Sequence, residues 1–183
     1  MLSHSLGEGA ELRPLEPWQA AEFAAYIERH RAHLAAWLPW AVSITDTDGA
    51  RTFLQPYADD TAADGRRIYG LRVDGDLVGG TVFRVFDSAA SLAEVGVWLA
   101  PGVQGRGLVT RAVTAMVDWA VRERGIHRIE WQCVPENTRS RAVAVRLGMT
   151  HEGTRRQAFE HAGRRWDTEA WAVLADEWVT MHP

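Results

Sequence analysis

A glycine-rich turn lies between two apolar segments near the middle of the chain. Positions 94–110 read EVGVWLAPGVQGRGLVT, where a strand pattern ends, glycines follow at 102, 105 and 107, and a helix pattern begins. Glycine lets the backbone approach a ligand closely, and the N–H groups of a first helical turn favour anions. Arg106 adds a positive charge. The segment predicts a phosphate-binding loop, and a plain strand–turn–helix connection is the alternative.

The loop contains no lysine, and neither does the rest of the chain, because all 20 basic residues are Arg. A P-loop lysine and a Schiff-base lysine are therefore excluded. A dinucleotide-binding G-x-G-x-x-G would need glycine where Thr110 stands. Any bound anion must be met by Arg, backbone N–H groups or a helix N-terminus.

Composition narrows the function classes further. A net charge of -4 argues against a direct nucleic-acid binder or an anionic-membrane binder. No apolar run approaches the roughly 20 residues of a membrane span. The single Cys133 excludes an internal disulfide and indicates a cytoplasmic location. His30 and His33 lack a third ligand with metal-like spacing, so we expect no metal site.

The elements that must position the loop alternate between helix and strand patterns. Helices are expected from Pro17 to about 27, at about His30–Trp37, from a Thr47 cap to about Asp60, and over Gly107–Arg124 and Asn137–Leu147. Strands are expected over Ala10–Pro14, Arg67–Val73, Leu77–Phe86, Ser91–Leu99, Arg128–Val134, Met149–Phe159 and Arg165–Leu174. Asp74-Gly75 is typical of a two-residue hairpin turn. This order predicts one α/β domain over 1–183 with a partly parallel sheet.

The chain resembles the GNAT superfamily of acyl-CoA-dependent N-acetyltransferases. The phosphate loop of that family reads Q/R-x-x-G-x-G/A, and Gln104, Gly107 and Val109 align with it, although Val109 replaces the usual small residue. Further stretches are similar to the RimJ/RimL branch, whose members acetylate the α-amino group of ribosomal proteins. They are positions 33–40, 94–99, 104–112, 128–131, 135–149 and 152–158.

The resemblance implies a fold and a cofactor site. It implies the GNAT fold, a mixed and largely antiparallel sheet of about seven strands whose central parallel pair splays around acyl-CoA, flanked by helices. Acetyl-CoA is the implied co-substrate. The residues implied to bind it are Val97, Trp98, Leu99, Gln104, Gly105, Arg106, Gly107, Leu108, Val109, Thr110, Asn137 and Ser140. Asn137 also serves as an ordinary helix N-cap.

The same resemblance implies catalytic groups. An amine that attacks a thioester must lose a proton, and Glu94 is the first candidate base. The alternative is a surface residue that pairs with an Arg. Many members place a Tyr acid where Ala144 stands, which leaves the Ser140 hydroxyl on the thiol side. The ribosomal enzymes carry an acidic base where Phe159 stands. Glu160 is one place later, so it reaches the site only through a bulge.

The sequence says least about the acceptor, the amine that receives the acetyl group. The candidate acceptor-binding residues are Trp37, Trp40, Phe159 and Trp166, although for each aromatic taken alone the core is the favoured interpretation. A protein or peptide N-terminus is the acceptor that the resemblance implies. The alternatives are a small amine (an aminoglycoside, polyamine or amino acid), a succinyl-type donor, or a catalytically silent CoA-binding sensor. We expect a monomer or homodimer.

Overall fold

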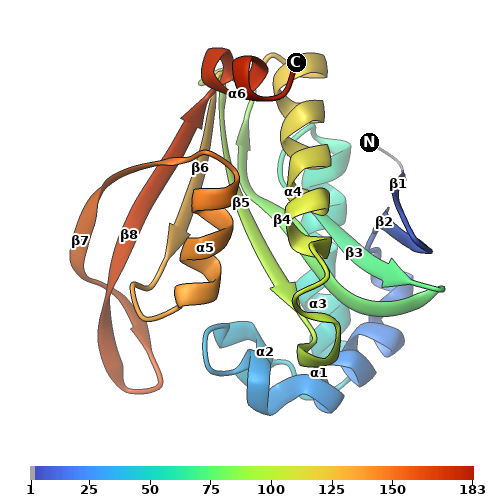
Figure 1. Cartoon of the computed structure of the whole chain (residues 1–183). Coiled ribbons are helices and arrows are strands. Elements are labelled where there is room, and N and C mark those ends of the chain that lie inside the picture. The colour runs from blue at the N-terminus through green and yellow to red at the C-terminus, as the bar shows by residue number, and fades with distance from the viewer. Residues whose placement is uncertain (1–2) are drawn as a thin grey trace. The chain divides into compact units, whose positions relative to one another are not determined.

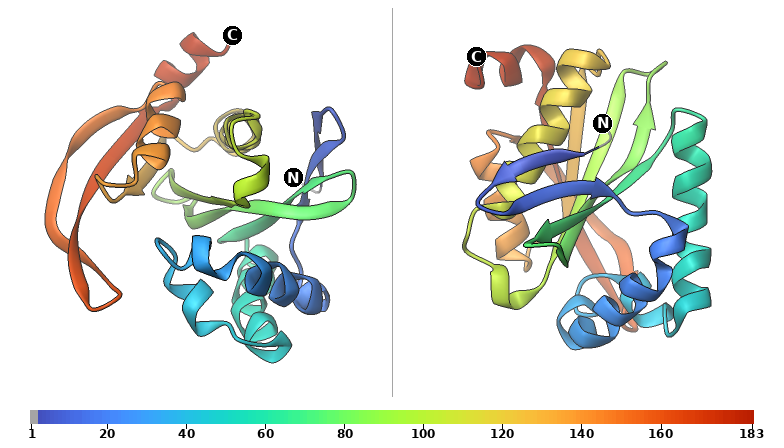
Figure 2. Two further views of the ribbon diagram at one scale, coloured as in Figure 1. Left: turned by 60° about the horizontal axis from the view of Figure 1, so that its bottom comes forward. Right: turned by 90° about the vertical axis from the view of Figure 1, so that its right-hand side faces the viewer.

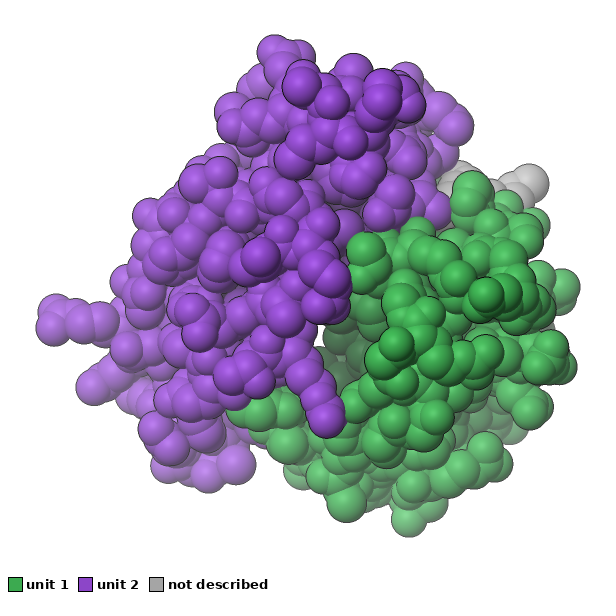
Figure 3. Space-filling model, in the orientation of Figure 1, with its two compact units in different colours: residues 1–83, 97–112 green, residues 84–96, 113–183 purple. Residues whose placement is uncertain are grey.

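The structure, a computed structural model, describes residues 3–183, which form two compact units. The first unit holds the described residues up to Phe83 together with Val97–Ala112, and the second holds Arg84–Gly96 and Val113–Pro183. Figure 3 colours the residues of each unit. The division does not test the prediction of a single domain over 1–183, which stays a prediction.

The described residues contain eight strands in the order β1-β2-β3-β4-β5-β6-β8-β7. Their bounds are β1 His4–Gly7, β2 Ala10–Pro14, β3 Arg67–Val73, β4 Asp76–Asp87, β5 Leu92–Leu99, β6 Arg128–Cys133, β7 Thr150–His161 and β8 Arg164–Leu174. The sheet is mostly antiparallel, and β5 and β6 form its parallel pair. The predicted mixed α/β architecture is confirmed, with one strand more than expected.

Six α-helices and three shorter helical segments accompany these strands in residues 3–183 (Figure 1). The α-helices are α1 Ala20–Leu34, α2 Pro39–Ser43, α3 Thr47–Ala62, α4 Leu108–Asp118, α5 Thr138–Arg146 and α6 Ala175–Met181. The short segments are η1 Pro17–Gln19, η2 Pro101–Val103 and η3 Trp119–Glu123, the last of which is a π-helical continuation of α4. No helix among the described residues is long and apolar enough to cross a membrane.

The first unit buries an apolar core under its three N-terminal helices, coloured blue to cyan in Figure 2. In α1 the buried Phe23, Ile27 and Leu34 recur at helical spacing and face this core. The Trp40 ring packs 5.6 Å, centroid to centroid, from that of Trp98 on β5. A Cβ at Gly80 would lie 2.1 Å from Trp98, so only glycine lets β4 approach the indole there. The core therefore fixes the end of β5.

The second unit places its core between α5 and one face of its strands. β6 pairs with β8 so that Trp131 lies opposite Trp171, and both rings are buried. At the chain's end, Trp178 of α6 is completely buried and its Nε1 donates to Asp118 Oδ1 over 2.8 Å. These contacts join β6 to β8 and α6 to the end of α4.

Several predicted elements differ from the observed ones. The two helices expected between Pro17 and Trp37 are one helix, α1, because residues 28–30 contain no helix breaker and the apolar spacing continues. The side chain of Asp46, not of Thr47, caps α3 by accepting from Gly49 N over 2.7 Å. The short elements β1, α2 and α6 were not expected. Their periodic patterns are too short to stand out from the sequence.

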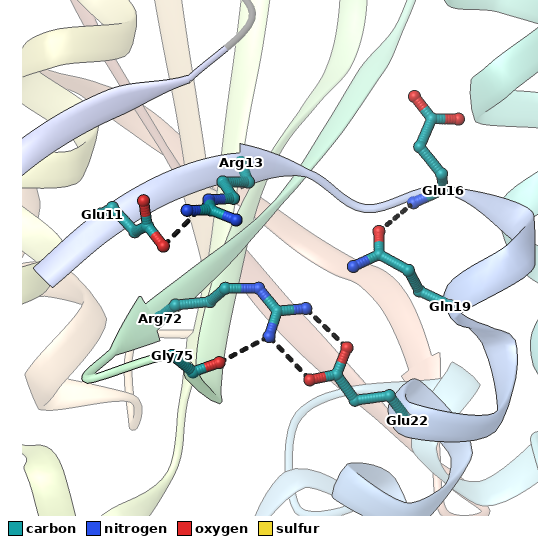
Figure 4. A network of polar contacts seen from close by, with 7 residues as sticks. All are labelled: Glu11, Arg13, Glu16, Gln19, Glu22, Arg72 and Gly75. Carbon is teal, nitrogen blue, oxygen red and sulfur yellow. Dashed lines mark hydrogen bonds and ion pairs between the residues drawn. The ribbon is translucent and has the colours of Figure 1, made fainter.

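An ion pair between α1 and β3 fastens the first unit (Figure 4). Arg72 Nη1 donates to Glu22 Oε1 and to the Gly75 carbonyl, each over 2.7 Å, and Nη2 donates to Glu22 Oε2. The Arg72 side chain is 9% exposed, whereas that of Glu22 is 41% exposed. Hydrogen bonds from Arg72 hold the pKa of Glu22 below its ordinary value. The pair joins the helix to the β3–β4 hairpin.

We expect Glu22→Gln to lower the free energy of unfolding by about 1–2 kcal/mol at pH 7, because it leaves a buried guanidinium with weaker partners. The folded-state pKa of Glu22 is depressed, so its stabilising effect is present above the ordinary carboxyl pKa and is lost as pH falls through the folded value. Urea unfolding of both proteins from pH 7 to pH 2.5 should show the difference shrinking.

Glu28→Gln on the same helix is the control, because the Glu28 side chain is 72% exposed and its pair with Arg31 lies at the surface. That variant should lose less than Glu22→Gln at pH 7. Equal losses from the two variants would contradict the assigned role of the Arg72 pair.

Candidate active site

The predicted phosphate loop joins β5 to α4 in the first unit (Figure 1). Gly105 has a φ of +80° and Gly107 a φ of +70°, a region that residues with a Cβ rarely adopt. Apart from each glycine and its two chain neighbours, no atom of the described residues lies within 4 Å of a Cβ built on either glycine. Glycine is therefore required here by the backbone path and not by crowding. The path delivers the chain directly into the first turn of α4, where N–H groups lack intrahelical partners.

Side chains of the loop differ in exposure. Arg106 is exposed, Leu108 is buried, and Val109 and Thr110 are half-buried. Gln104 Nε2 lies 3.1 Å from Nε2 of His33 on α1. The fold, and no pattern in the sequence, brings His33 to the loop. A half-buried Val109 is compatible with the helical first turn.

Glu94 stands on β5, three residues before the backbone predicted to pair with the cofactor arm, and its side chain is 8% exposed. Arg84 Nη1 lies 3.0 Å from Glu94 Oε1, and Gln132 Nε2 donates to Oε2 over a long 3.4 Å. Oε1 has no aligned hydrogen-bond donor among the described residues. The Arg84 contact is therefore a charge contact without hydrogen-bond geometry.

The surroundings of Glu94 raise its pKa above the ordinary carboxyl value. Burial is the largest cause, and the Glu130 carboxylate adds to it. Arg84 and Arg155 act in the opposite direction and do not outweigh burial. A carboxylate of raised basicity is better suited to accept a proton near neutral pH than an exposed glutamate.

Asn137 and Ser140 lie at the start of α5. The Asn137 side chain caps the helix by accepting from Ser140 N over 3.1 Å, so its predicted capping role is confirmed. Trp131 Nε1 donates to Ser140 Oγ over 3.1 Å. The indole N–H uses a lone pair of this hydroxyl, so the Ser140 O–H remains a donor, and Ser140 also hydrogen-bonds with the Cys133 side chain.

A buried polar cluster behind Ser140 was not expected from the sequence. Glu169 of β8 is 6% exposed, and its Oε2 accepts from Trp171 Nε1 over 3.1 Å and lies 2.9 Å from Arg141 Nε. The Cys133 thiol donates to the same oxygen over 3.9 Å. Burial and the Glu169 charge raise the pKa of Cys133 to about 11, so the thiol is neutral at pH 7. Only strand pairing brings positions 133 and 169 together.

The β7–β8 hairpin contains the bulge on which the role of Glu160 depends. Arg155 pairs with Thr168, but the next pair is Phe159 with Trp166, so β7 carries two extra residues. Gln157 has a φ of 52°, and its N–H donates to Asp167 Oδ1 over 2.8 Å. Side chains alternate between the two faces of a strand, and the bulge adds an even number of residues. Phe159 therefore lies on the same face of β7 as Arg155.

Strand register decides which predicted residues share a face in the second unit. Glu94 pairs with Glu130, and Glu130 with Ala172, which is an even number of positions from Trp166. Glu94, Phe159 and Trp166 therefore share one face. Glu160 points to the other face, is 64% exposed and lies 3.0 Å from Arg165. The bulge therefore does not bring Glu160 to the face of Glu94.

The predicted acceptor residues of the first unit lie partly in its core. Trp40 packs against Phe23 and Phe53, with centroid distances of 5.7 and 5.6 Å. Trp37 is half-buried in the turn that follows α1. Among the described residues, no group of three or more His, Cys, Asp or Glu side chains is placed to hold a metal ion.

Comparisons with known proteins identify the family. Residues 11–150 match the model of the acetyltransferase (GNAT) domain. The chain belongs to the GNAT family. It is an acyl-CoA-dependent N-acetyltransferase, and the GNAT fold expected from the sequence is confirmed.

Relatives of this GNAT acetyltransferase include ribosomal-protein enzymes. A putative ribosomal N-acetyltransferase of Bacillus subtilis, YdaF, is 29% identical over 97% of this chain and 98% of its own length. The ribosomal-protein-serine acetyltransferase of Escherichia coli is 22% identical over 84% and 86%. The structure of RimL, a ribosomal L7/L12 α-N-protein acetyltransferase in complex with coenzyme A, has a TM-score of 0.90 at 23% identity, over 94% and 98%. This last likeness shows the fold.

We expect Glu94→Gln to raise the free energy of unfolding at pH 8. The raised folded-state pKa means that the unfolded chain loses this proton first, so the stability of the wild type falls as pH rises from the ordinary carboxyl pKa through the folded value. The gain from Glu94→Gln should therefore shrink toward pH 4. Thermal or urea unfolding across this range measures it.

Glu130→Gln is the matched control, because the Glu130 carboxylate lies 2.7 Å from Arg128 Nε. Removing that charge relieves its repulsion of Glu94 but also loses the Arg128 pair, so we expect no net gain at pH 8. A loss of stability in Glu94→Gln at pH 8 would show that the Arg84 contact outweighs burial.

Proposed function

We propose that this enzyme transfers an acetyl group from acetyl-CoA to the α-amino group of a protein or peptide. The observation that carries the proposal is a buried Glu94 carboxylate of raised pKa on the strand that leads into a glycine loop and a helix N-terminus. The named activities of the relatives in B. subtilis and E. coli support the ribosomal-protein class of acceptor. We expect the enzyme to act in the cytoplasm as a monomer or homodimer.

The loop and its neighbours are proposed to hold the co-substrate. Acetyl-CoA supplies the thioester that the amine attacks. The backbone N–H groups of Gln104–Thr110 and the first turn of α4 are suited to its diphosphate, with Arg106 adding charge. The backbones of Val97 and Leu99 are proposed to bind the pantetheine arm and to stabilise the oxyanion. The left-handed Gly105 and Gly107 fit such a cradle.

Glu94 is proposed as the base. An α-amino group has a pKa of about 8, so most of it is protonated at pH 7 and must lose a proton before attack. Glu94 Oε1, which lacks an aligned donor among the described residues, is available to accept that proton directly or through water. Glu160 is not part of this proposal, because it pairs with Arg165 on the other face of its strand.

Ser140 is proposed to act at the thiol side. The Trp131 indole orients its hydroxyl, which leaves the O–H able to donate a hydrogen bond to the departing sulfur. Many members place a Tyr acid at the position of Ala144. In this chain the Ser140 hydroxyl is proposed to take the place of that Tyr. Phe159 and Trp166 share the face of Glu94 and are proposed to contact the acceptor.

We expect Glu94→Gln to lower kcat/KM by about 10²–10⁴-fold, because the amide cannot accept the proton. In the wild type, activity should fall at acidic pH with an apparent pKa above the ordinary carboxyl value. Thiol release from acetyl-CoA, followed from pH 5 to 9, measures both effects.

Glu130→Gln serves as the control for this kinetic experiment. It should keep the rate and move the acidic limb to lower pH, because the Glu130 charge contributes to the raised pKa of Glu94. Full turnover by Glu94→Gln at every pH would refute the assignment of the base.

The acceptor class is tested with a panel of amines. Peptides with a free α-amino group should release thiol from acetyl-CoA, whereas the same peptides with a blocked N-terminus and an internal Lys should not. Spermidine, an aminoglycoside and free amino acids form the second arm. Turnover only in that arm would favour a small-molecule enzyme, and coenzyme A binding without turnover of any amine would favour a silent sensor. Succinyl-CoA replaces acetyl-CoA in a parallel series.

A further inference from the structure

Arg111 lies in the first unit, near the start of α4, and its N–H donates to the carbonyl of Gly107 over 3.0 Å. The side chain is 35% exposed, but Nε and Nη2 are buried and have no hydrogen-bond partner among the described residues. Nε and Nη2 form the edge with which a guanidinium binds carboxylate or phosphate in a bidentate way. One such edge is therefore left unsatisfied beside the predicted phosphate loop.

The remaining nitrogen of Arg111, Nη1, contacts the Glu8 carboxylate, which another anion could displace. Nη1 lies 3.4 Å from Oε2 of Glu8, in the turn between β1 and β2, and the Glu8 side chain is 71% exposed. A long, exposed ion pair of this kind contributes little and is easily exchanged for a better anion. Glu8 itself has a φ of 52°, so the turn presents its side chain from a constrained backbone.

The location of Arg111 also calls for an anion. A cation near a helix N-terminus is repelled by the partial positive charge there. Long helical side chains lean toward the N-terminus, which directs Arg111 back over the turn that contains Gly107. A phosphate at this end would relieve the repulsion and satisfy both orphaned N–H groups. In the structure, the Glu8 carboxylate, 3.4 Å from Nη1, takes the position of such an anion.

We propose that Arg111 exchanges Glu8 for a phosphate group of acyl-CoA, which it binds through Nε and Nη2. Glu8 thus acts as an intramolecular anion that competes with the ligand for one guanidinium. The exchange requires Arg111 to turn about its side-chain torsions, and the free energy of two unsatisfied donors favours that movement. The phosphate belongs either to the diphosphate or to the 3′-phosphate. The inference rests on the proposed use of acyl-CoA.

Calorimetric binding of coenzyme A to the full chain tests the exchange. Arg111→Met should weaken binding about 10- to 100-fold, because two charge-assisted hydrogen bonds are lost, and Arg111→Lys should recover only part of it. Glu8→Gln should tighten binding by about two- to five-fold. In the Glu8→Gln, Arg111→Met double variant, Glu8→Gln should have no further effect.

Arg51→Ala is the control for the loss of one positive charge, because Arg51 pairs with Asp48 at the surface of α3. It should bind coenzyme A as the wild type does, and circular dichroism checks the fold of every variant. The same series with 3′-dephospho-CoA locates the contact. An equal loss in Arg111→Met for both ligands assigns Arg111 to the diphosphate, and a loss confined to coenzyme A assigns it to the 3′-phosphate.

Two results would overturn the inference while leaving the proposed function intact. One is wild-type affinity of Arg111→Met for coenzyme A. The other is unchanged or weaker binding by Glu8→Gln, which would remove the competition. Failure of the wild type to bind coenzyme A at all would instead refute the proposed function.

Discussion

The parallel pairing of β5 with β6 is the constraint on which the second unit depends. It sets Glu94 opposite Glu130 and Val95 opposite Trp131. Since side chains alternate along a strand, this one register sends Glu94 to one face and Trp131, with Ser140 bonded to it, to the other. A slip of one residue would exchange the two faces. The proposed base and the proposed thiol-side hydroxyl are thus separated by backbone hydrogen bonding and not by their own contacts.

Buried charge in this chain is carried by Arg–carboxylate pairs. Arg72 with Glu22 and Arg141 with Glu169 each join a helix to a strand, and in each pair one partner is buried while the other reaches solvent. Partial exposure limits the desolvation penalty, which a fully buried ion pair seldom recovers. Glu94 is the exception, because burial outweighs its Arg84 contact and leaves the carboxyl more basic than usual. A carboxyl whose pKa is raised by burial is a candidate functional group, which is the reason that Glu94 is proposed as the base.

Residue types at short sequence spacing made many of the strands and turns predictable. Ala10–Pro14 and Arg67–Val73 are strands at the expected bounds, and Asp74 and Gly75 both adopt positive φ in the expected hairpin turn. Such elements are specified by nearest neighbours: β-branched residues, turn residues and caps. The boundaries of long helices were less predictable, since α1 continues as long as packing against α3 favours it. Among the short elements, β2 and β3 were recognised from the sequence, whereas β1, α2 and α6 were not.

By itself the sequence determined the loop, its glycines, the Asn137 cap and the family, because each depends on residue types at short, fixed spacing. Tertiary structure alone decided the environment of Glu94, the contact of His33 with Gln104, the cluster of Cys133 with Glu169 and the face of Glu160. These depend on strand register and on pairings between positions 36 to 71 residues apart. Residue type fixes which charge a side chain can carry, but only packing fixes how much water and which partner surround that charge.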